Sequence, residues 1–78
     1  MPFYLFQWTD LRLEKLELNG VDREDFESIV MNPMRRVVSR SSGRPMAIGY
    51  TASGDLVACV YELHADGITV LPITAYFI

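Results

Sequence analysis

The segment from Arg44 to Leu63 constrains the fold most, because it predicts a β-hairpin at the centre of the domain. Two apolar runs flank Thr51–Asp55, a small and polar stretch in which Gly54 can adopt the positive φ of a three-residue hairpin loop. This loop also sets the pairing of the two strands. The predicted cross-strand pairs are Tyr50 with Leu56, Ile48 with Ala58, Met46 with Val60, and Arg44 with Glu62.

Both faces of this hairpin are mainly apolar. Because side chains alternate along a strand, the eight paired residues share one face. The other face carries Pro45, Ala47, Gly49, Val57, Cys59 and Tyr61. We therefore expect other parts of the structure to cover the hairpin on each side, and their identity bears directly on function.

Length and composition predict a single domain, residues 1–78, near the size at which one core is barely sufficient. Half of the residues are apolar, which is typical of a folded chain. No apolar run approaches the ~20 residues of a membrane span, and no secretory signal is recognisable. Cys59 is the only cysteine, so an internal disulfide is excluded. We expect a bacterial-type cytoplasmic protein that forms an oligomer or binds an obligate partner, because its apolar material exceeds what so small a domain encloses.

Charge is distributed unevenly along the chain. Residues 1–33 contain seven acids and three bases, whereas residues 34–44 contain four arginines and no acid. The net charge of −3 and the pI near 4.9 are unusual for a nucleic-acid-binding domain. The short arginine-rich segment is the one feature that favours such a role.

The remaining patterns predict an α+β domain in which two helices pack on one face of an antiparallel sheet of about four strands. A turn at His64–Gly67, with its Asp-Gly pair, leads into the last strand, where Pro72 indicates an edge or a bulge. The expected elements before the hairpin are a short edge strand at Phe3–Trp8, a helix that is N-capped by Thr9 or Asp10 and ends near Leu18, a helix after Asp22 up to Asn32, and a strand at Met34–Arg40. A last strand is expected at Ile68–Ile78.

The first helix has two apolar sides. Leu13 and Leu16 share one side, and Leu11 and Leu18, seven residues apart, share nearly the opposite one. The second side either packs on another chain, or Leu11 simply lies at a frayed helix start.

The second helix has strong start signals. Asp22 is the expected N-cap and Asp25 the partner of a capping box, while Val21 and Phe26 fit a hydrophobic staple.

Several short motifs, taken in their order, resemble the BrnT-type toxins of bacterial type II toxin–antitoxin systems. They are Trp8-Thr9-Asp10, Gly20-Val21, Asn32-Pro33, Ser39–Pro45, Gly49–Thr51, Val60–Glu62 and Pro72–Tyr76. The resemblance implies a RelE-like fold, ribonuclease activity and RNA binding, and a cognate antitoxin as partner. The chain departs from the family pattern at Asn19 and Lys15, where family members carry histidine.

Metal-independent RNA cleavage needs cations for the phosphorane charge and groups that move protons. Arg44 is the best candidate, because its planar guanidinium matches phosphate oxygens, and Arg40 is the next. Lys15 could add a charge or a proton, and Tyr61 or Tyr50 a hydrogen bond. Alternatively, Arg44 forms a structural ion pair with Glu62 across the hairpin.

No cofactor or metal is expected. His64 is the only histidine and belongs to a turn, and no glycine-rich phosphate loop precedes a helix.

Two further hypotheses stand beside the ribonuclease. In the first, the chain is a non-catalytic binding module that takes a partner through Leu11 and Leu18 or through its C-terminal strand. In the second, the chain self-associates through that strand, which ends in four residues without a charge. These residues are Ala75, Tyr76, Phe77 and Ile78.

Overall fold

The computed structural model describes residues 4–78, so the predicted start of the first strand at Phe3 lies outside the described residues. Seven elements follow one another in this region. They are β1 (Leu5–Phe6), α1 (Asp10–Leu18), α2 (Arg23–Met31), β2 (Arg35–Val38), β3 (Pro45–Tyr50), β4 (Leu56–Leu63) and β5 (Thr69–Phe77).

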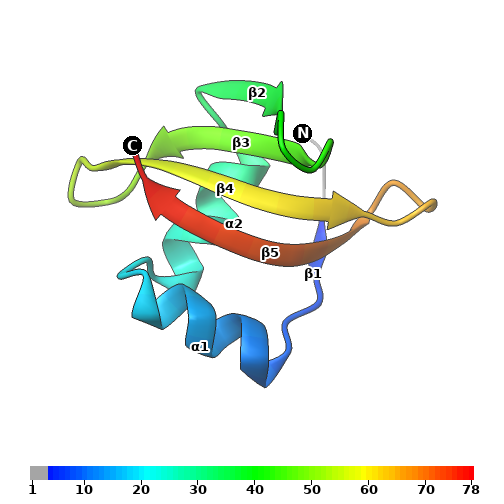
Figure 1. The fold of residues 1–78 in the computed structure, drawn as a ribbon, viewed down its shortest axis with the longest axis horizontal. Coiled ribbons are helices and arrows are strands. Elements are labelled where there is room, and N and C mark those ends of the chain that lie inside the picture. Colours follow the sequence, from blue (N-terminus) through cyan, green and yellow to red (C-terminus); the bar gives the residue numbers. More distant parts are fainter. Residues whose placement is uncertain (1–3) are drawn as a thin grey trace.

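The strands form one sheet in the order β1-β5-β4-β3-β2. Strands β2 to β5 are antiparallel neighbours, and β1 runs parallel to β5 through two residues. The α+β architecture is as predicted, with five strands in place of about four. Figure 1 shows both helices on one side of the sheet, with α2 behind the strands and α1 beside β5.

The central hairpin adopts the predicted register, because the observed β3–β4 pairs join Tyr50 to Leu56, Ile48 to Ala58 and Met46 to Val60. Gly54 has the expected positive φ, +89°. The loop is closed by a hydrogen bond of 2.8 Å from the Thr51 N–H to the Asp55 carbonyl. Turn chemistry and the two-residue period were therefore sufficient to specify this element.

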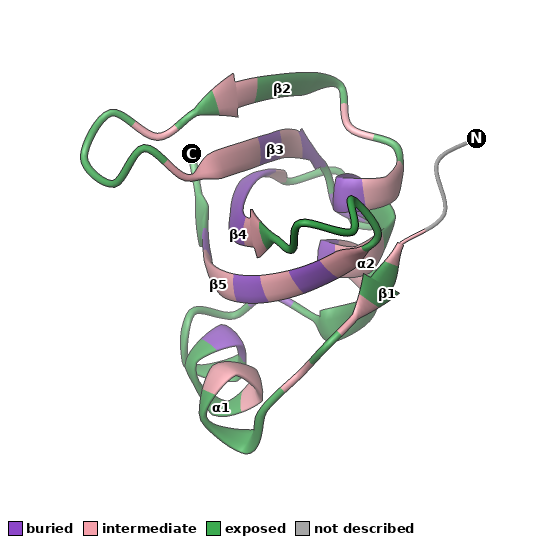
Figure 2. Cartoon of the chain, turned by 90° about the vertical axis from the view of Figure 1, so that its right-hand side faces the viewer, coloured by how far each residue is buried: buried purple, intermediate pink, exposed green. Residues whose placement is uncertain are grey.

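The helices cover one face of the hairpin and leave the other open. The covered face carries Ala47, Val57 and Cys59, all with no exposed surface. At Gly49 on this face, an added Cβ would lie 3.2 Å from the Ile29 side chain, so β3 and α2 approach closely there. Figure 2 shows the buried residues concentrated on β3, β4, β5 and the two helices. The helical contribution to the core is Leu16, Phe26, Ile29 and Val30.

The opposite face, which we call the open face, has no helix on it within residues 4–78. It carries Arg44, Met46, Ile48, Tyr50, Leu56, Ala58, Val60 and Glu62, extended by Arg35 opposite Ile48 and by Tyr76 opposite Ala58. The predicted cover is therefore present on one face of the hairpin and absent from the other within residues 4–78.

Helix α1 begins as predicted, because the Thr9 hydroxyl accepts a hydrogen bond from the Arg12 N–H at 3.2 Å. At α2 the predicted capping box is wrong. Asp22 precedes the helix but its side chain makes no capping bond. The Asp25 carboxylate instead accepts the Ala52 N–H of the hairpin loop at 3.1 Å, so a tertiary contact replaces the local one.

Strand β2 is shorter than the predicted Met34–Arg40, because residues 40–42 belong to a turn. The Gly43 N–H bonds to the Ser39 carbonyl at 2.8 Å, and Gly43 has a φ of +71°. The last strand contains the bulge that Pro72 predicted. Tyr61 pairs with Pro72 and Val60 with Thr74, so Ile73 is the extra residue.

The β4–β5 turn forms at the predicted Asp-Gly pair and is stabilised by the Asp66 carboxylate. This carboxylate accepts the N–H groups of Ile68 and Thr69 and the Thr69 hydroxyl at 2.8–2.9 Å. The backbone bond from Thr69, followed by the one from Ile68, lowers the pKa of Asp66 from 3.8 to about 2.

This turn is expected to make stability depend on pH. Because the folded pKa is the lower one, the carboxylate stabilises the fold above about pH 4, and this contribution disappears as the pH falls towards about 2. We expect Asp66→Asn to melt a few degrees below wild type at pH 7, with the two curves converging near pH 2. Thermal melts followed by circular dichroism measure the gap, with Asp55→Asn in the other hairpin as control. A gap that stays constant from pH 7 to pH 2 would contradict this.

Candidate functional site

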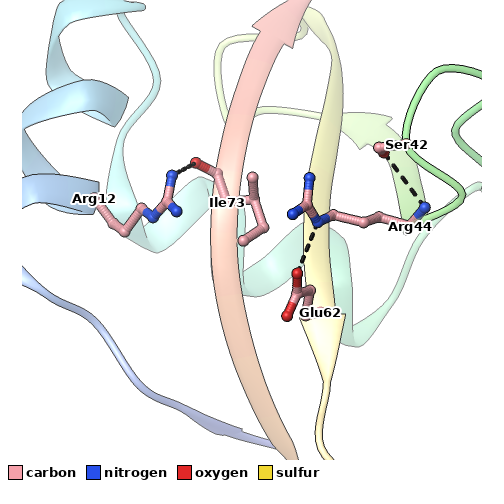
Figure 3. Close-up of polar contacts among 5 residues, drawn as sticks. All are labelled: Arg12, Ser42, Arg44, Glu62 and Ile73. Atoms are coloured by element: carbon pink, nitrogen blue, oxygen red, sulfur yellow. Dashed lines mark hydrogen bonds and ion pairs between the residues drawn. The ribbon is translucent and has the colours of Figure 1, made fainter.

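Arg44 lies at one end of the open face and forms an ion pair with Glu62 on the neighbouring strand. Its Nε donates to Glu62 Oε1 at 2.8 Å, and both side chains are about two-fifths exposed. Figure 3 shows the rest of the guanidinium directed away from the carboxylate. An ion pair this exposed contributes little stability, so Glu62 chiefly orients the arginine.

Arg40 belongs to the exposed turn between β2 and β3, the same connection that leads into Arg44. The Arg44 N–H contacts Ser42 Oγ at 3.4 Å, and the Ser39 N–H bonds to the Arg44 carbonyl at 2.8 Å. The turn that carries Arg40 is therefore bonded directly to the backbone of Arg44.

Tyr61 lies on the covered face and is buried. Its hydroxyl accepts a hydrogen bond of 2.9 Å from Arg36 Nη1, and Arg36 Nη2 donates to the Val30 carbonyl at 3.0 Å. This arginine thus joins β2 to β4 and to the C-terminal end of α2. Tyr61 has a structural role in this arrangement and is separated from Arg44 by the sheet.

Lys15 is exposed on α1, in the helical layer. The four predicted catalytic residues therefore divide into two groups. Arg44 lies at the end of the open face, with the turn of Arg40 bonded to its backbone, whereas Lys15 and Tyr61 lie on the helical side.

Two arginines that the sequence did not single out make the more informative contacts. One is Arg36, with its bonds to Tyr61 and Val30, and the other is Arg12 of α1, which donates from Nη1 to the carbonyl of Ile73 at 3.3 Å. Figure 3 shows Arg12 and Arg44 on either side of the β5 bulge, with the Ile73 side chain directed towards Arg44. The bulge predicted at Pro72 was the available signal, because a bulge leaves backbone groups for side chains to bind.

The outer edge of β5 beyond Val70 has no strand neighbour among the described residues, but α1 partly closes it. Asn19 Nδ2, about two helical turns after Arg12, donates to the Ala75 carbonyl at 2.8 Å. Ala75 is buried, whereas Tyr76, Phe77 and Ile78 are exposed. A strand added at this edge would have to displace Arg12 from the Ile73 carbonyl and Asn19 from the Ala75 carbonyl.

Leu11 and Leu18 are the most exposed large apolar residues of the helices, at 70% and 80%. Leu16 is buried in the core and Leu13 is half-buried. The predicted second apolar side of α1 is thus present and is in contact with solvent.

A solvent-open hollow of about 550 Å³ lies at the start of α2 and contains none of the predicted catalytic residues. Glu27 is held there by Trp8 Nε1 at 2.7 Å and by Arg23 Nε at 3.3 Å. The hollow is lined by Asp22, Arg23, Glu24 and Glu27.

The remaining reactive side chains are placed as the sequence predicts. Cys59 is buried, and burial, with a smaller effect of the Asp25 charge, raises the pKa of its thiol to about 12. His64 is exposed in its turn. Residues 4–78 contain no group of three His, Cys, Asp or Glu side chains that could hold a metal ion. None of the helices described is long and apolar enough to cross a membrane.

Comparison with protein-family models, with curated proteins and with solved structures found no match to this chain. The likeness to BrnT-type toxins therefore rests on the sequence motifs alone.

Proposed function

We propose that this chain is a cytoplasmic toxin of BrnT type that cleaves RNA without a metal and is neutralised by a cognate antitoxin. The observation that carries the proposal is the position of Arg44, held by Glu62 at the end of an open face that also exposes tyrosines. The architecture of two helices on one face of an antiparallel sheet is consistent with the fold that the resemblance implies.

In this proposal RNA lies across the open face. Arg44 and Arg40 bind the phosphate and stabilise its developing negative charge. Glu62, 2.8 Å from Arg44, is a carboxylate on this face that accepts the 2′-hydroxyl proton as the 2′-oxygen attacks phosphorus. The bond from phosphorus to the 5′-oxygen then breaks, and this oxygen takes a proton from solvent, which leaves a 2′,3′-cyclic phosphate and a 5′-hydroxyl. Tyr50 and Tyr76, exposed at 59% and 46%, offer rings on which bases can stack.

The test is expression of the chain in a bacterial host together with cleavage of a mixed-sequence RNA by the purified protein. We expect wild type to arrest growth and Arg44→Ala to lower the cleavage rate about 10²–10³-fold. Arg44→Lys retains the charge but loses the planar fork, and it should recover only part of this rate. Arg23→Ala, an exposed arginine of α2, is the matched control. Normal growth and an unchanged RNA profile on induction would contradict the proposal.

A second candidate is a non-catalytic protein-binding module that retains the fold. Two observations favour it. Arg44 already forms an ion pair with Glu62, and Lys15 and Tyr61 lie on the helical side, away from Arg44. This function predicts no RNA cleavage but a partner that copurifies with the chain. Loss of the partner in a variant of the open face, with RNA profiles unchanged, would distinguish it from the ribonuclease.

A further inference from the structure

We propose that the open face binds the outer side of α1 from a second copy of this chain, so that copies associate head to tail. The inference concerns association of the purified chain and does not depend on ribonuclease activity. It joins two of the apolar surfaces that residues 4–78 leave without a cover: the open face, and the pair Leu11 and Leu18 on α1.

The open face is apolar at its centre. Its centre is formed by the small side chains of Ala58 and Val60 on β4, which are 1% and 6% exposed. Larger apolar groups of the neighbouring strands border them, with Tyr50 and Tyr76 the most exposed. The hydroxyl of Tyr76 contacts the sulfur of Met46 on β3 at 3.5 Å, so these side chains bridge β4.

Helix α1 supplies a matching surface. Leu11 and Leu18 are seven residues apart, which places them on one side of the helix about 10 Å apart. Two strand spacings are also about 10 Å. The two leucines can therefore contact the open face on both sides of β4 when the helix crosses it.

Charge selects this pairing over the alternatives. On α1 the acids Asp10, Glu14 and Glu17 outnumber the bases Arg12 and Lys15 by one. On the open face Arg35 and Arg44 outnumber Glu62 by one. Two open faces together would join surfaces of net positive charge, and two α1 helices would join surfaces of net negative charge. The contact between unlike surfaces instead joins a surface of net negative charge to one of net positive charge.

A contact between unlike surfaces has a distinctive signature. Each copy retains one free open face and one free α1, so association continues beyond the dimer into rings or chains. A substitution that disrupts either surface stops this growth. When one copy has a disrupted open face and the other a disrupted α1, a single contact remains between them, so association ends at the dimer.

The experiment uses two variants of the full chain with substitutions at exposed positions. One is Arg35→Glu with Tyr50→Glu on the open face, and the other is Leu11→Glu with Leu18→Glu on α1. At about 100 μM, a concentration that populates weak complexes, we expect wild type to exceed dimer mass by sedimentation velocity. Each variant alone should be monomeric, and their equimolar mixture should form a dimer. Circular dichroism establishes that both variants are folded.

Met34→Glu, an exposed position outside both surfaces, is the matched control and should associate as wild type does. A monomeric wild type at this concentration overturns the proposal. So does a folded variant that still associates alone. A mixture that stays monomeric also overturns it. The mixture pairs the intact α1 of one variant with the intact open face of the other, and the proposed contact would form between them.

Discussion

Phe26→Ala is expected to lower the free energy of unfolding by about 3–5 kcal/mol, the largest effect expected of a single substitution in this chain. Phe26 has no exposed surface and is the largest fully buried side chain. Its ring packs edge-on against Trp8 at 5.2 Å between centroids. Removing it leaves a cavity between α2, the sheet and the segment before α1, which the backbone cannot fill without moving the helix.

The size of the domain makes this loss severe. A chain of 78 residues has a total stability of roughly 4–12 kcal/mol at the usual value per residue. Urea unfolding followed by the fluorescence of Trp8, the only tryptophan, measures the change directly. Phe26→Leu should lose less, and Ser28→Ala, exposed on the same helix, should stay within about 0.5 kcal/mol. A loss below 1 kcal/mol in Phe26→Ala would show that α2 does not dock through this ring.

The fold was predictable where local chemistry decides it. Gly54 and the Asp66-Gly67 pair determine two tight turns, and the alternation of side chains then determines the register of the strands between them. The capping box of α2 failed because Asp25 and Ala52, 27 residues apart in sequence, meet in space. A tertiary partner of this kind leaves no trace in a pattern of four residues.

Of the candidate site, the position of Arg44 beside Glu62 was predictable from the sequence. The assignment of Tyr61 to the same site was an avoidable error. Tyr61 and Glu62 are consecutive in β4, so they point to opposite faces. Since Glu62 shares a face with Arg44, Tyr61 cannot. The role of Arg36 was harder to foresee, because it depends on how α2 lies behind the sheet. The available hint was that the last turn of α2 contains no basic residue of its own.

The second large effect is expected at Arg36. Replacing it with methionine, which keeps much of the aliphatic stem, should destabilise the fold by about 1–3 kcal/mol. The substitution removes the charged donor from a carbonyl near the end of α2 and from the buried Tyr61 hydroxyl. It also removes the guanidinium stacked 5.9 Å from the centre of the Tyr4 ring. Arg36→Lys has one ammonium group for two acceptors and should lose an intermediate amount.

Arg35→Met is the matched control, because the neighbouring side chain lies on the open face and makes no hydrogen bond or ion pair within the described part of the chain. It should change stability by less than about 0.5 kcal/mol. A double-mutant cycle with Tyr61→Phe then isolates the bond between the two side chains. A coupling energy near zero would mean that the hydrogen bond between Arg36 and Tyr61 does not contribute to stability. A clear coupling would instead assign Tyr61 to the framework and leave Arg44, Arg40 and Glu62 as the groups that any chemistry on the open face must use.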